Sequence, residues 1–149
     1  MNITYKNTIT ADEVNAIRKS MGWRQLPPDE RMQAELDEKE FLISAYDEDK
    51  AVGMATSGGT ILLMPDYQFK GIENEFFNRI FDFTRKKLRP GDGISIEIRA
   101  WNEKQIALYE SLGFQISTPE LRGIPMHICL TNQIELTDKR FKQMEFKEE

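Results

Sequence analysis

Hydrophobic residues recur with two different periods along the chain, and these periods separate expected helices from expected strands. In three segments, residues 10–23, 72–88 and 102–112, apolar side chains return every three to four positions, which predicts helices with one buried face. Thr10 and Glu13 have the spacing of a capping box at the start of the first segment. A fourth segment, residues 27–39, is mostly polar and begins with proline, which suits a first helical turn.

Shorter apolar or alternating segments predict the strands. The clearest alternation lies at residues 94–100, where every second residue is isoleucine and the residues between are Ser95, Glu97 and Arg99. The apolar run at residues 59–64 is of the kind expected for a central strand. The other expected strands are residues 1–6, 40–49, 50–58, 114–118 and 124–131.

The order of these elements predicts an α/β fold. Strands before the helix at 72–88 are joined as a hairpin run, which indicates a mixed sheet with helices on both faces. No repeat or linker divides the chain, so we expect a single domain over residues 1–149. From about residue 132 the sequence becomes highly charged, and we expect a short amphipathic helix or a frayed end there.

Composition narrows the classes of partner. The formal net charge is −5, so nonspecific attraction to nucleic acid is not expected, whereas basic amines or peptides would be attracted. No apolar run is long enough to span a membrane, and residues 1–10 lack the pattern of a secretion signal. The one cysteine, Cys129, excludes an internal disulfide and fits a reducing cytoplasm. With a single histidine, His127, we expect no structural zinc site and no metal.

Three polar side chains have both a structural and a chemical interpretation. Asn102 precedes a helix with Gln105 three residues later, the pattern of an N-cap. Tyr109 lies near the apolar face of that helix, as packing tyrosines with a hydroxyl at the rim commonly do. Glu97 shares a strand face with Arg99, which suits a solvated surface or an ion pair. Spacing alone favours the structural interpretation for each of them, and contact with a ligand is the alternative.

The segment "QFKGIENEFF", residues 68–77, leads from a loop into a helix through the single glycine Gly71. Unpaired N–H groups at a helix start can bind phosphate. A pyrophosphate cradle normally contains more glycine, because the backbone must approach the anion closely. His127 alternates with apolar neighbours on an expected strand, and we interpret it as structural.

Two segments together resemble the GNAT superfamily of acetyl-CoA-dependent N-acetyltransferases, over roughly residues 40–130. "ILLMPDYQFKGIENEFFNRIFDF" is similar to the family's acetyl-CoA segment, in which Gln/Arg-x-x-Gly-x-Gly/Ala opens a helix. "ISIEIRAWNEKQIALYESLGF" is similar to the family's strand and its N-x-x-A-x-x-L-Y-x-x-x-G-F helix. The nearest pattern is that of the ribosomal-protein N-terminal alanine acetyltransferases. The resemblance implies a GNAT-like fold with a central, mostly antiparallel sheet of about six to seven strands.

The resemblance also implies how acetyl-CoA would be held as co-substrate. Backbone groups of Ile61, Leu62 and Leu63 would pair with the pantetheine arm like an added strand. Asn102 would touch the cofactor near its pantetheine. The N–H groups that would face the pyrophosphate are those of Phe69, Lys70, Gly71, Ile72, Glu73 and Asn74.

The catalytic roles follow from the same resemblance. Tyr109 would stand by the thioester sulfur as general acid, and Glu97 would be the general base. A primary amine must lose a proton to attack, and the departing thiolate must gain one. Direct transfer needs no covalent intermediate if both substrates are held side by side. The expected partner is an amine acceptor, a protein N-terminus or a small molecule, and a homodimer is compatible with the sequence.

Two positions depart from the family pattern. Glu73 replaces the small Gly or Ala of the phosphate loop, and Phe69 replaces the usual polar or basic residue, while Lys70 is kept. One alternative is therefore a degenerate GNAT-fold binding protein without catalysis. Another is an acetyltransferase for a small molecule, such as a polyamine or an aminoglycoside. We expect residues 24–32 and 117–125 to select the acceptor.

Overall fold

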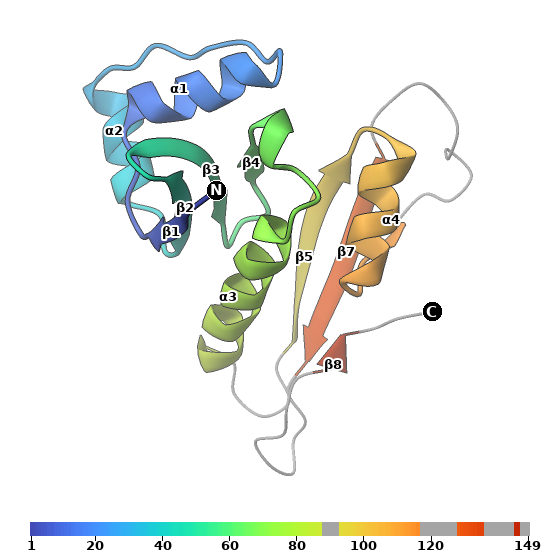
Figure 1. The fold of residues 1–149 in the computed structure, drawn as a ribbon. Coiled ribbons are helices and arrows are strands. Elements are labelled where there is room, and N and C mark those ends of the chain that lie inside the picture. Colours follow the sequence, from blue (N-terminus) through green and yellow to red (C-terminus); the bar gives the residue numbers. More distant parts are fainter. Residues whose placement is uncertain (88–92, 117–127, 136–144, 147–149) are drawn as a thin grey trace. The chain divides into compact units, whose positions relative to one another are not determined.

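The structure is a computed structural model that describes residues 1–87, 93–116, 128–135 and 145–146 (Figure 1). The chain divides into two compact units, Met1–Ile80 and Phe81–Glu149, and the division falls inside helix α3 (Ile72–Lys87). Each unit contains one four-stranded sheet. None of the helices in the described ranges combines the length and the apolar character needed to cross a membrane.

The first unit is built on an antiparallel sheet with the strand order β1-β2-β3-β4. Its strands are β1 (Ile3–Lys6), β2 (Leu42–Asp47), β3 (Lys50–Thr56) and β4 (Ile61–Leu63). Its other elements are α1 (Ala11–Ser20), α2 (Glu30–Asp37), the 3-10 turn η1 (Pro65–Tyr67) and the first turns of α3. The hairpin expected between residues 40 and 58 is confirmed as β2 and β3.

The prediction that residues 59–64 form a central strand is wrong, because β4 lies at the edge of its sheet. Its apolar character comes from cover on both faces instead. Helix α1 packs against β4. On the other face, Leu63 of β4 and Phe76 of α3 both come close to Gly53 of β3. Leu62 and Leu63 are therefore buried, although no other strand of this sheet pairs with the outer backbone edge of β4.

Helices lie on both faces of this sheet. Tyr46 points to α1, where its hydroxyl donates to the Glu13 carboxylate at 2.7 Å. Tyr5 points the other way, and its ring meets Phe76 of α3 edge-on at 6.2 Å. Because Tyr5 pairs with the residue next to Tyr46, the two rings belong to opposite faces. The expected arrangement of helices is thus confirmed for the first unit.

The two N-terminal helices are held by polar contacts as well as by packing. Thr10 and Glu13 form the predicted capping box of α1. Helix α2 begins later than expected, at Glu30 with Asp29 as its N-cap, and the preceding prolines lie outside it. No residue of α2 is buried. Gln33 connects it to the first helix by accepting from the Ala11 N–H at 2.9 Å.

The second unit contains the end of α3 and a second antiparallel sheet with the order β5-β7-β6. The elements are β5 (Gly93–Ala100), α4 (Glu103–Ser111), β6 (Gln115–Ile116), β7 (Ile128–Glu135) and β8 (Glu145–Phe146). The helix or frayed end expected for the charged tail is wrong at residues 145–146, which pair with β7 as a strand. Strand β7 extends four residues beyond its expected end, so its backbone offers partners for β8.

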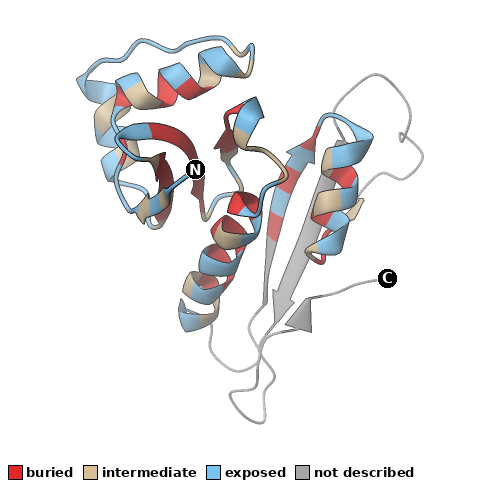
Figure 2. Cartoon of the chain, viewed as in Figure 1, coloured by how far each residue is buried: buried red, intermediate tan, exposed pale blue. Residues whose placement is uncertain are grey.

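The α/β class and the antiparallel pairing are confirmed, whereas the described strands form two sheets of four rather than one of six or seven. Figure 2 shows buried residues along the sheet-facing sides of the helices. Helix α3 follows its predicted apolar stripe closely. Its buried residues are Ile72, Glu73, Phe76, Phe77, Ile80, Phe81 and Thr84. The acidic member of that set, Glu73, is the exception to the stripe.

Candidate active site

The edge of β4 presents backbone groups that no strand of its sheet uses. Met64 N–H donates to the Val52 carbonyl at 2.8 Å. Backbone groups alternate in direction along an antiparallel strand, so Leu63 and Ile61 point away from β3. Leu62, between them, points its N–H and carbonyl toward β3. Of the three residues expected to pair with pantetheine, two have the required direction.

One of these outward groups already has a partner. The side chain of Gln68 donates to the Leu63 carbonyl at 2.9 Å. The turn between them is anchored by Tyr67, whose hydroxyl donates to Asp47 Oδ2 at 2.6 Å, and this bond raises the pKa of Tyr67. This contact of Gln68 was not predicted, although its place at the head of the Gln-x-x-Gly pattern was the available signal.

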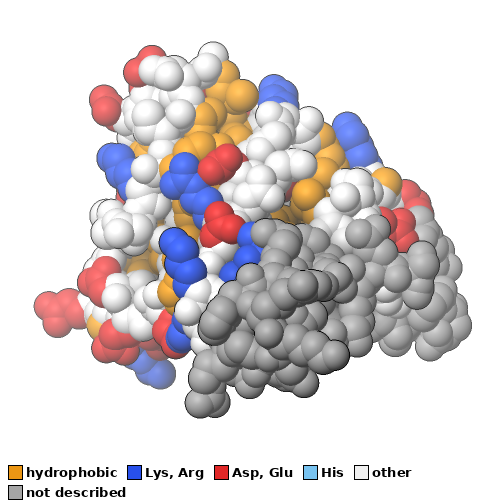
Figure 3. Space-filling view, turned by 90° about the horizontal axis from the view of Figure 1, so that it is seen from below, with side chains coloured by type: hydrophobic (Ala, Val, Ile, Leu, Met, Phe, Trp, Pro, Cys, Tyr) orange, Lys and Arg blue, Asp and Glu red, His pale blue; other side chains and the backbone are white. Residues whose placement is uncertain are grey.

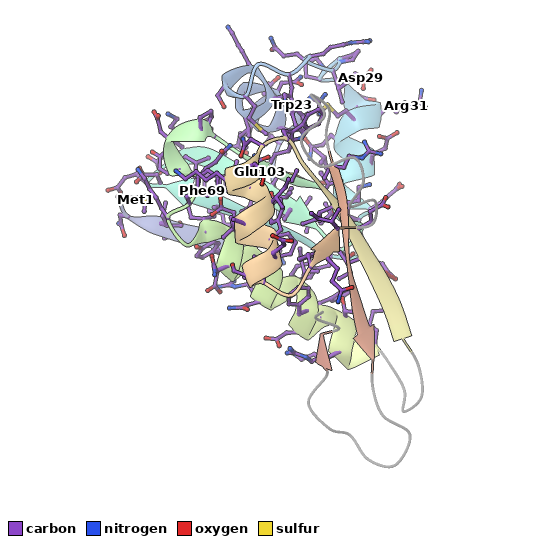
Figure 4. The ribbon with its side chains drawn as sticks, turned by 90° about the vertical axis from the view of Figure 1, so that its right-hand side faces the viewer. Met1, Trp23, Asp29, Arg31, Phe69 and Glu103 are labelled. Atoms are coloured by element: carbon purple, nitrogen blue, oxygen red, sulfur yellow. The ribbon has the colours of Figure 1, made fainter. Side chains whose placement is uncertain are left out.

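The loop before α3 has an unusual backbone. Phe69, labelled in Figure 4, has φ of +63° and Gly71 has φ of +99°. A left-handed conformation suits glycine but costs a bulky L-residue roughly 1–2 kcal/mol. In this conformation the Phe69 N–H donates to Glu73 Oε2 at 2.9 Å. The loop is therefore closed by a carboxylate of its own helix.

Glu73 is 4% exposed, and its second oxygen, Oε1, is buried without a hydrogen-bond partner among the described residues. A buried carboxylate oxygen normally has a partner, because an unmet one costs free energy. The sequence signal was the replacement of a small residue by Glu73. What the sequence could not indicate was that the side chain turns back onto the loop.

Helix α3 begins with open donors. The first of its backbone amides with a helical hydrogen bond is that of Glu75, which donates to the Gly71 carbonyl at 3.2 Å. Within the described chain, the N–H groups of Ile72, Glu73 and Asn74 have no backbone partner, as expected at a helix start. Lys70 beside them is exposed. These groups could meet an anion, and their contact with a pyrophosphate stays a prediction.

In the second unit, Asn102 is the N-cap of α4. Its Oδ1 accepts from Gln105 N–H at 2.9 Å, and Gln105 in turn accepts from Trp101 N–H at 2.7 Å. Figure 4 labels Glu103, the first helical residue after this cap. The capping interpretation is confirmed. Asn102 is exposed, and its amide NH₂ has no partner in the ranges that the structure describes, so the side chain can cap and still donate to a ligand.

Tyr109 is 5% exposed, which confirms the packing interpretation for its ring. Its ring lies 6.2 Å from that of Phe114. The helix ends two residues later, and Gly113 has a left-handed conformation with φ of +97°. The catalytic role of the hydroxyl stays a prediction.

Glu97 lies on the exposed face of β5. Glu97 and Arg99 are exposed, while Ile96 and Ile98 are buried, so the alternation predicted for this strand is confirmed. No ion pair joins Glu97 to a described side chain. The role of Glu97 as a base stays a prediction.

Candidate residues thus occur in both units, with the segment from Ile61 to Asn74 in the first and Glu97, Asn102 and Tyr109 in the second. His127 and residues 117–125 lie outside the described residues. Figure 3 shows that the Lys and Arg side chains on this face are interspersed with Asp and Glu side chains. In the described ranges, no group of three or more His, Cys, Asp or Glu side chains could hold a metal ion.

Comparison with known proteins relates this arrangement to solved structures. No protein-family model matches the sequence, and no curated protein matches it significantly. The ribosomal-protein-S18-alanine N-acetyltransferase of Escherichia coli aligns with TM-score 0.59 and 20% identity over 95% of this chain and 99% of its own. An acetyltransferase of the GNAT family from Streptococcus pneumoniae aligns with TM-score 0.57 and 19% identity over 80% and 90%.

A third similar structure is the Salmonella typhimurium protein yncA, solved with its cofactor acetyl-CoA. It aligns with TM-score 0.62 and 15% identity over 97% of this chain and 99% of its own. At these identities the likeness concerns the fold, and it extends over most of both chains in all three cases. The chain therefore has the fold of the GNAT-family acetyltransferases.

Proposed function

We propose that residues 1–149 act as one acetyltransferase domain that moves an acetyl group from acetyl-CoA to a primary amine. The observation that carries the proposal is the edge of β4, where Ile61 and Leu63 direct backbone groups away from the sheet. An amide-containing arm such as pantetheine can bond to such an edge as a strand does. The shared fold supports the proposal, and one structure with that fold holds acetyl-CoA.

The reaction needs two proton transfers. The amine nitrogen attacks the thioester carbonyl carbon, the new C–N bond forms, and the C–S bond breaks with its electron pair on sulfur. We assign the amine proton to the Glu97 carboxylate, which is exposed and has no ion-pair partner among the described side chains. We assign the proton that neutralises the thiolate to the Tyr109 hydroxyl. Groups of these types commonly contribute 10²–10⁴-fold to a rate.

Asn102 is assigned to the cofactor through its amide NH₂, because its Oδ1 is already used by the helix cap. For the acceptor we propose a protein N-terminus first. The Escherichia coli structure is that of an enzyme for the ribosomal-protein-S18 alanine, and its alignment covers 95% of this chain. A polyamine or an aminoglycoside is the alternative acceptor.

A second candidate function is that of a binding protein without catalysis. The observation that favours it is the Glu73 carboxylate, which occupies the Phe69 N–H in the loop expected to face pyrophosphate. This candidate requires no transfer activity with any amine. It therefore differs from the enzyme proposal in a measurable way.

Two measurements on the full chain test the proposal. Calorimetric titration with acetyl-CoA asks whether the donor binds, and a transfer screen asks whether an acetyl group reaches an amine. The screen uses peptides with free N-termini, polyamines and aminoglycosides, and it records thiol release together with the acetylated product by mass spectrometry. Binding with transfer to one class supports the proposal. Donor binding without transfer to any amine would refute the proposed transferase, and absence of donor binding would refute it and favour the binding protein.

A further inference from the structure

We propose that Glu73 removes the diphosphate from donor recognition, so that the site takes acyl-pantetheine thioesters whether or not a nucleotide follows. This inference rests on the proposed function, because it assigns the donor class of the same site. It makes Glu73 a residue that determines specificity.

The position of the carboxylate carries the first step. Glu73 Oε2 accepts the Phe69 N–H at 2.9 Å, so a loop amide expected to face the pyrophosphate already has an anionic partner. Glu73 is only 4% exposed, and its other oxygen, Oε1, has no hydrogen-bond partner among the described residues. The loop therefore contains a fixed carboxylate with one unmet oxygen.

The charge of this carboxylate is not neutralised by an ion pair within the described chain. Its neighbour Glu75 differs in this respect, because Arg79 pairs with it at 2.6 Å. A buried charge is screened less by water and salt than an exposed one. A diphosphate brought to the open amides at the start of α3 would meet this negative charge at short range. Repulsion offsets the attraction of those amides and of the helix dipole.

The two departures from the family pattern act together in this loop. Phe69 has φ of +63°, and this conformation aims its N–H at the Glu73 carboxylate. A bulky residue is retained in such a conformation only where its surroundings fix it. The hydrogen bond to Glu73 is one such fixing contact. Displacement of Glu73 by a ligand anion would therefore also release the backbone of the loop.

The pantetheine arm does not encounter this charge effect. It is uncharged, and its expected partners are the outward backbone groups of Ile61 and Leu63 on β4. Removing the charge of Glu73 should then strengthen binding of donors that carry phosphate and leave donors without phosphate unchanged. A variant that changed donor affinity in general would instead affect donors with and without phosphate alike.

The experiment compares two donors on three proteins by calorimetric titration. The donors are acetyl-CoA and S-acetylpantetheine, which has no phosphate. The proteins are the wild-type chain, Glu73→Gln and the control Glu75→Gln. Glutamine at position 73 keeps the acceptor for the Phe69 N–H and removes the charge. The control removes the same charge from the same turn, at a residue whose carboxylate accepts from Arg79.

We expect Glu73→Gln to bind acetyl-CoA more tightly by on the order of 10-fold, with S-acetylpantetheine changed by less than about twofold. Glu75→Gln should keep the wild-type ratio of the two affinities. Glu73→Gly is a second variant that removes the side chain and should shift the ratio in the same direction. An unchanged ratio in both Glu73 variants would overturn the inference.

The same titrations separate this inference from the proposed function. If donors bind with the expected ratios but no amine is acetylated, the proposed function fails and the inference stands. If acetyl transfer occurs but acetyl-CoA gains nothing over S-acetylpantetheine in the Glu73 variants, the inference fails and the function stands. If neither donor binds to any of the proteins, both are refuted.

Discussion

Tyr109 and Phe114 meet across the end of α4. The Phe114 N–H donates to the Tyr109 carbonyl at 3.1 Å, and the Gly113 N–H donates to the Glu110 carbonyl at 3.1 Å. These two bonds form a Schellman motif, in which the residue after the glycine commonly packs on the helix. The rings of Tyr109 and Phe114 make that contact, at 6.2 Å and an angle of 61°. The position of the Tyr109 ring is thus fixed by the helix ending as well as by the core.

Tyr109→Phe should therefore fold normally, because the ring contact is kept. If the hydroxyl is the general acid, kcat should fall by on the order of 10²-fold or more. Steady-state kinetics with a preferred amine, together with thermal unfolding, measures both effects. Tyr5→Phe is the matched control, since the Tyr5 ring also meets a phenylalanine edge-on at 6.2 Å. Equal turnover in the two variants would show that the Tyr109 hydroxyl has no part in catalysis.

Asn102 allows capping and ligand contact to be separated. Asn102→Ser keeps a good N-cap, so the melting temperature should change little, while the amide NH₂ is lost. Asn102→Ala should cost about 1 kcal/mol of stability through loss of the cap. If the NH₂ touches the donor, both variants should bind acetyl-CoA more weakly and only the alanine variant should melt earlier. A serine variant with wild-type donor affinity would limit Asn102 to capping.

Glu97→Gln tests the base. The variant preserves shape and removes the carboxylate, so we expect a lower rate at neutral pH. The rate should recover partly at high pH, where more of the amine is already deprotonated. A pH–rate profile against Arg99→Gln gives the comparison, because Arg99 is exposed on the same strand face. A wild-type profile for Glu97→Gln would assign proton removal to another group or to water.

Local patterns predicted the elements that local forces determine. The capping box at Thr10 and the N-cap at Asn102 depend on neighbouring residues, and both are present. The apolar stripe of α3 was visible because helical periodicity repeats within a few turns. The fold family was visible because two motifs kept their spacing.

Features that depend on distant pairing were not predictable in the same way. An apolar run such as 59–64 indicates burial, and burial at a sheet edge under two helices looks the same in sequence as burial in a central strand. The number of strands that join in one sheet could not be predicted either, because it also depends on pairing between distant segments. The Glu73 side chain could equally have pointed to solvent, and its bond to the Phe69 N–H depends on a left-handed phenylalanine that no propensity favours.

Gly53 sets how closely β4 approaches β3. A Cβ at this position would lie 2.6 Å from Leu63 Cδ1 and 2.9 Å from the Leu62 carbonyl oxygen. Gly53→Ala should therefore displace β4 and destabilise the protein by about 1–3 kcal/mol. Gly58→Ala is the control, since its Cβ would meet nothing closer than Thr56 Oγ1 at 3.8 Å. Chemical denaturation measures both, and equal stability of the two variants would contradict this account of the strand contact.

The Glu13 carboxylate connects α1 to β2 and should make stability depend on pH. Oε1 accepts from the Thr10 N–H at 3.0 Å and from the Tyr46 hydroxyl at 2.7 Å. Burial acts to raise the pKa of Glu13, but the bonds from Thr10 and Tyr46 outweigh it and lower the pKa. Burial, and then the bond to Glu13, raise the pKa of Tyr46.

The directions of these shifts define the pH window. Because the pKa of Glu13 is lower in the folded chain, its contribution is complete above the unfolded value of about 4.3 and is lost as pH falls through the folded value. The raised pKa of Tyr46 gives a contribution that is complete below about 10 and is lost at higher pH. Tyr46→Phe should cost about 1 kcal/mol at neutral pH, since Glu13 is partly exposed. Thermal unfolding of wild type and variant should show a gap in melting temperature that narrows below about pH 4. A gap that persists unchanged at pH about 3 would mean that the charge of Glu13 adds nothing to this bond.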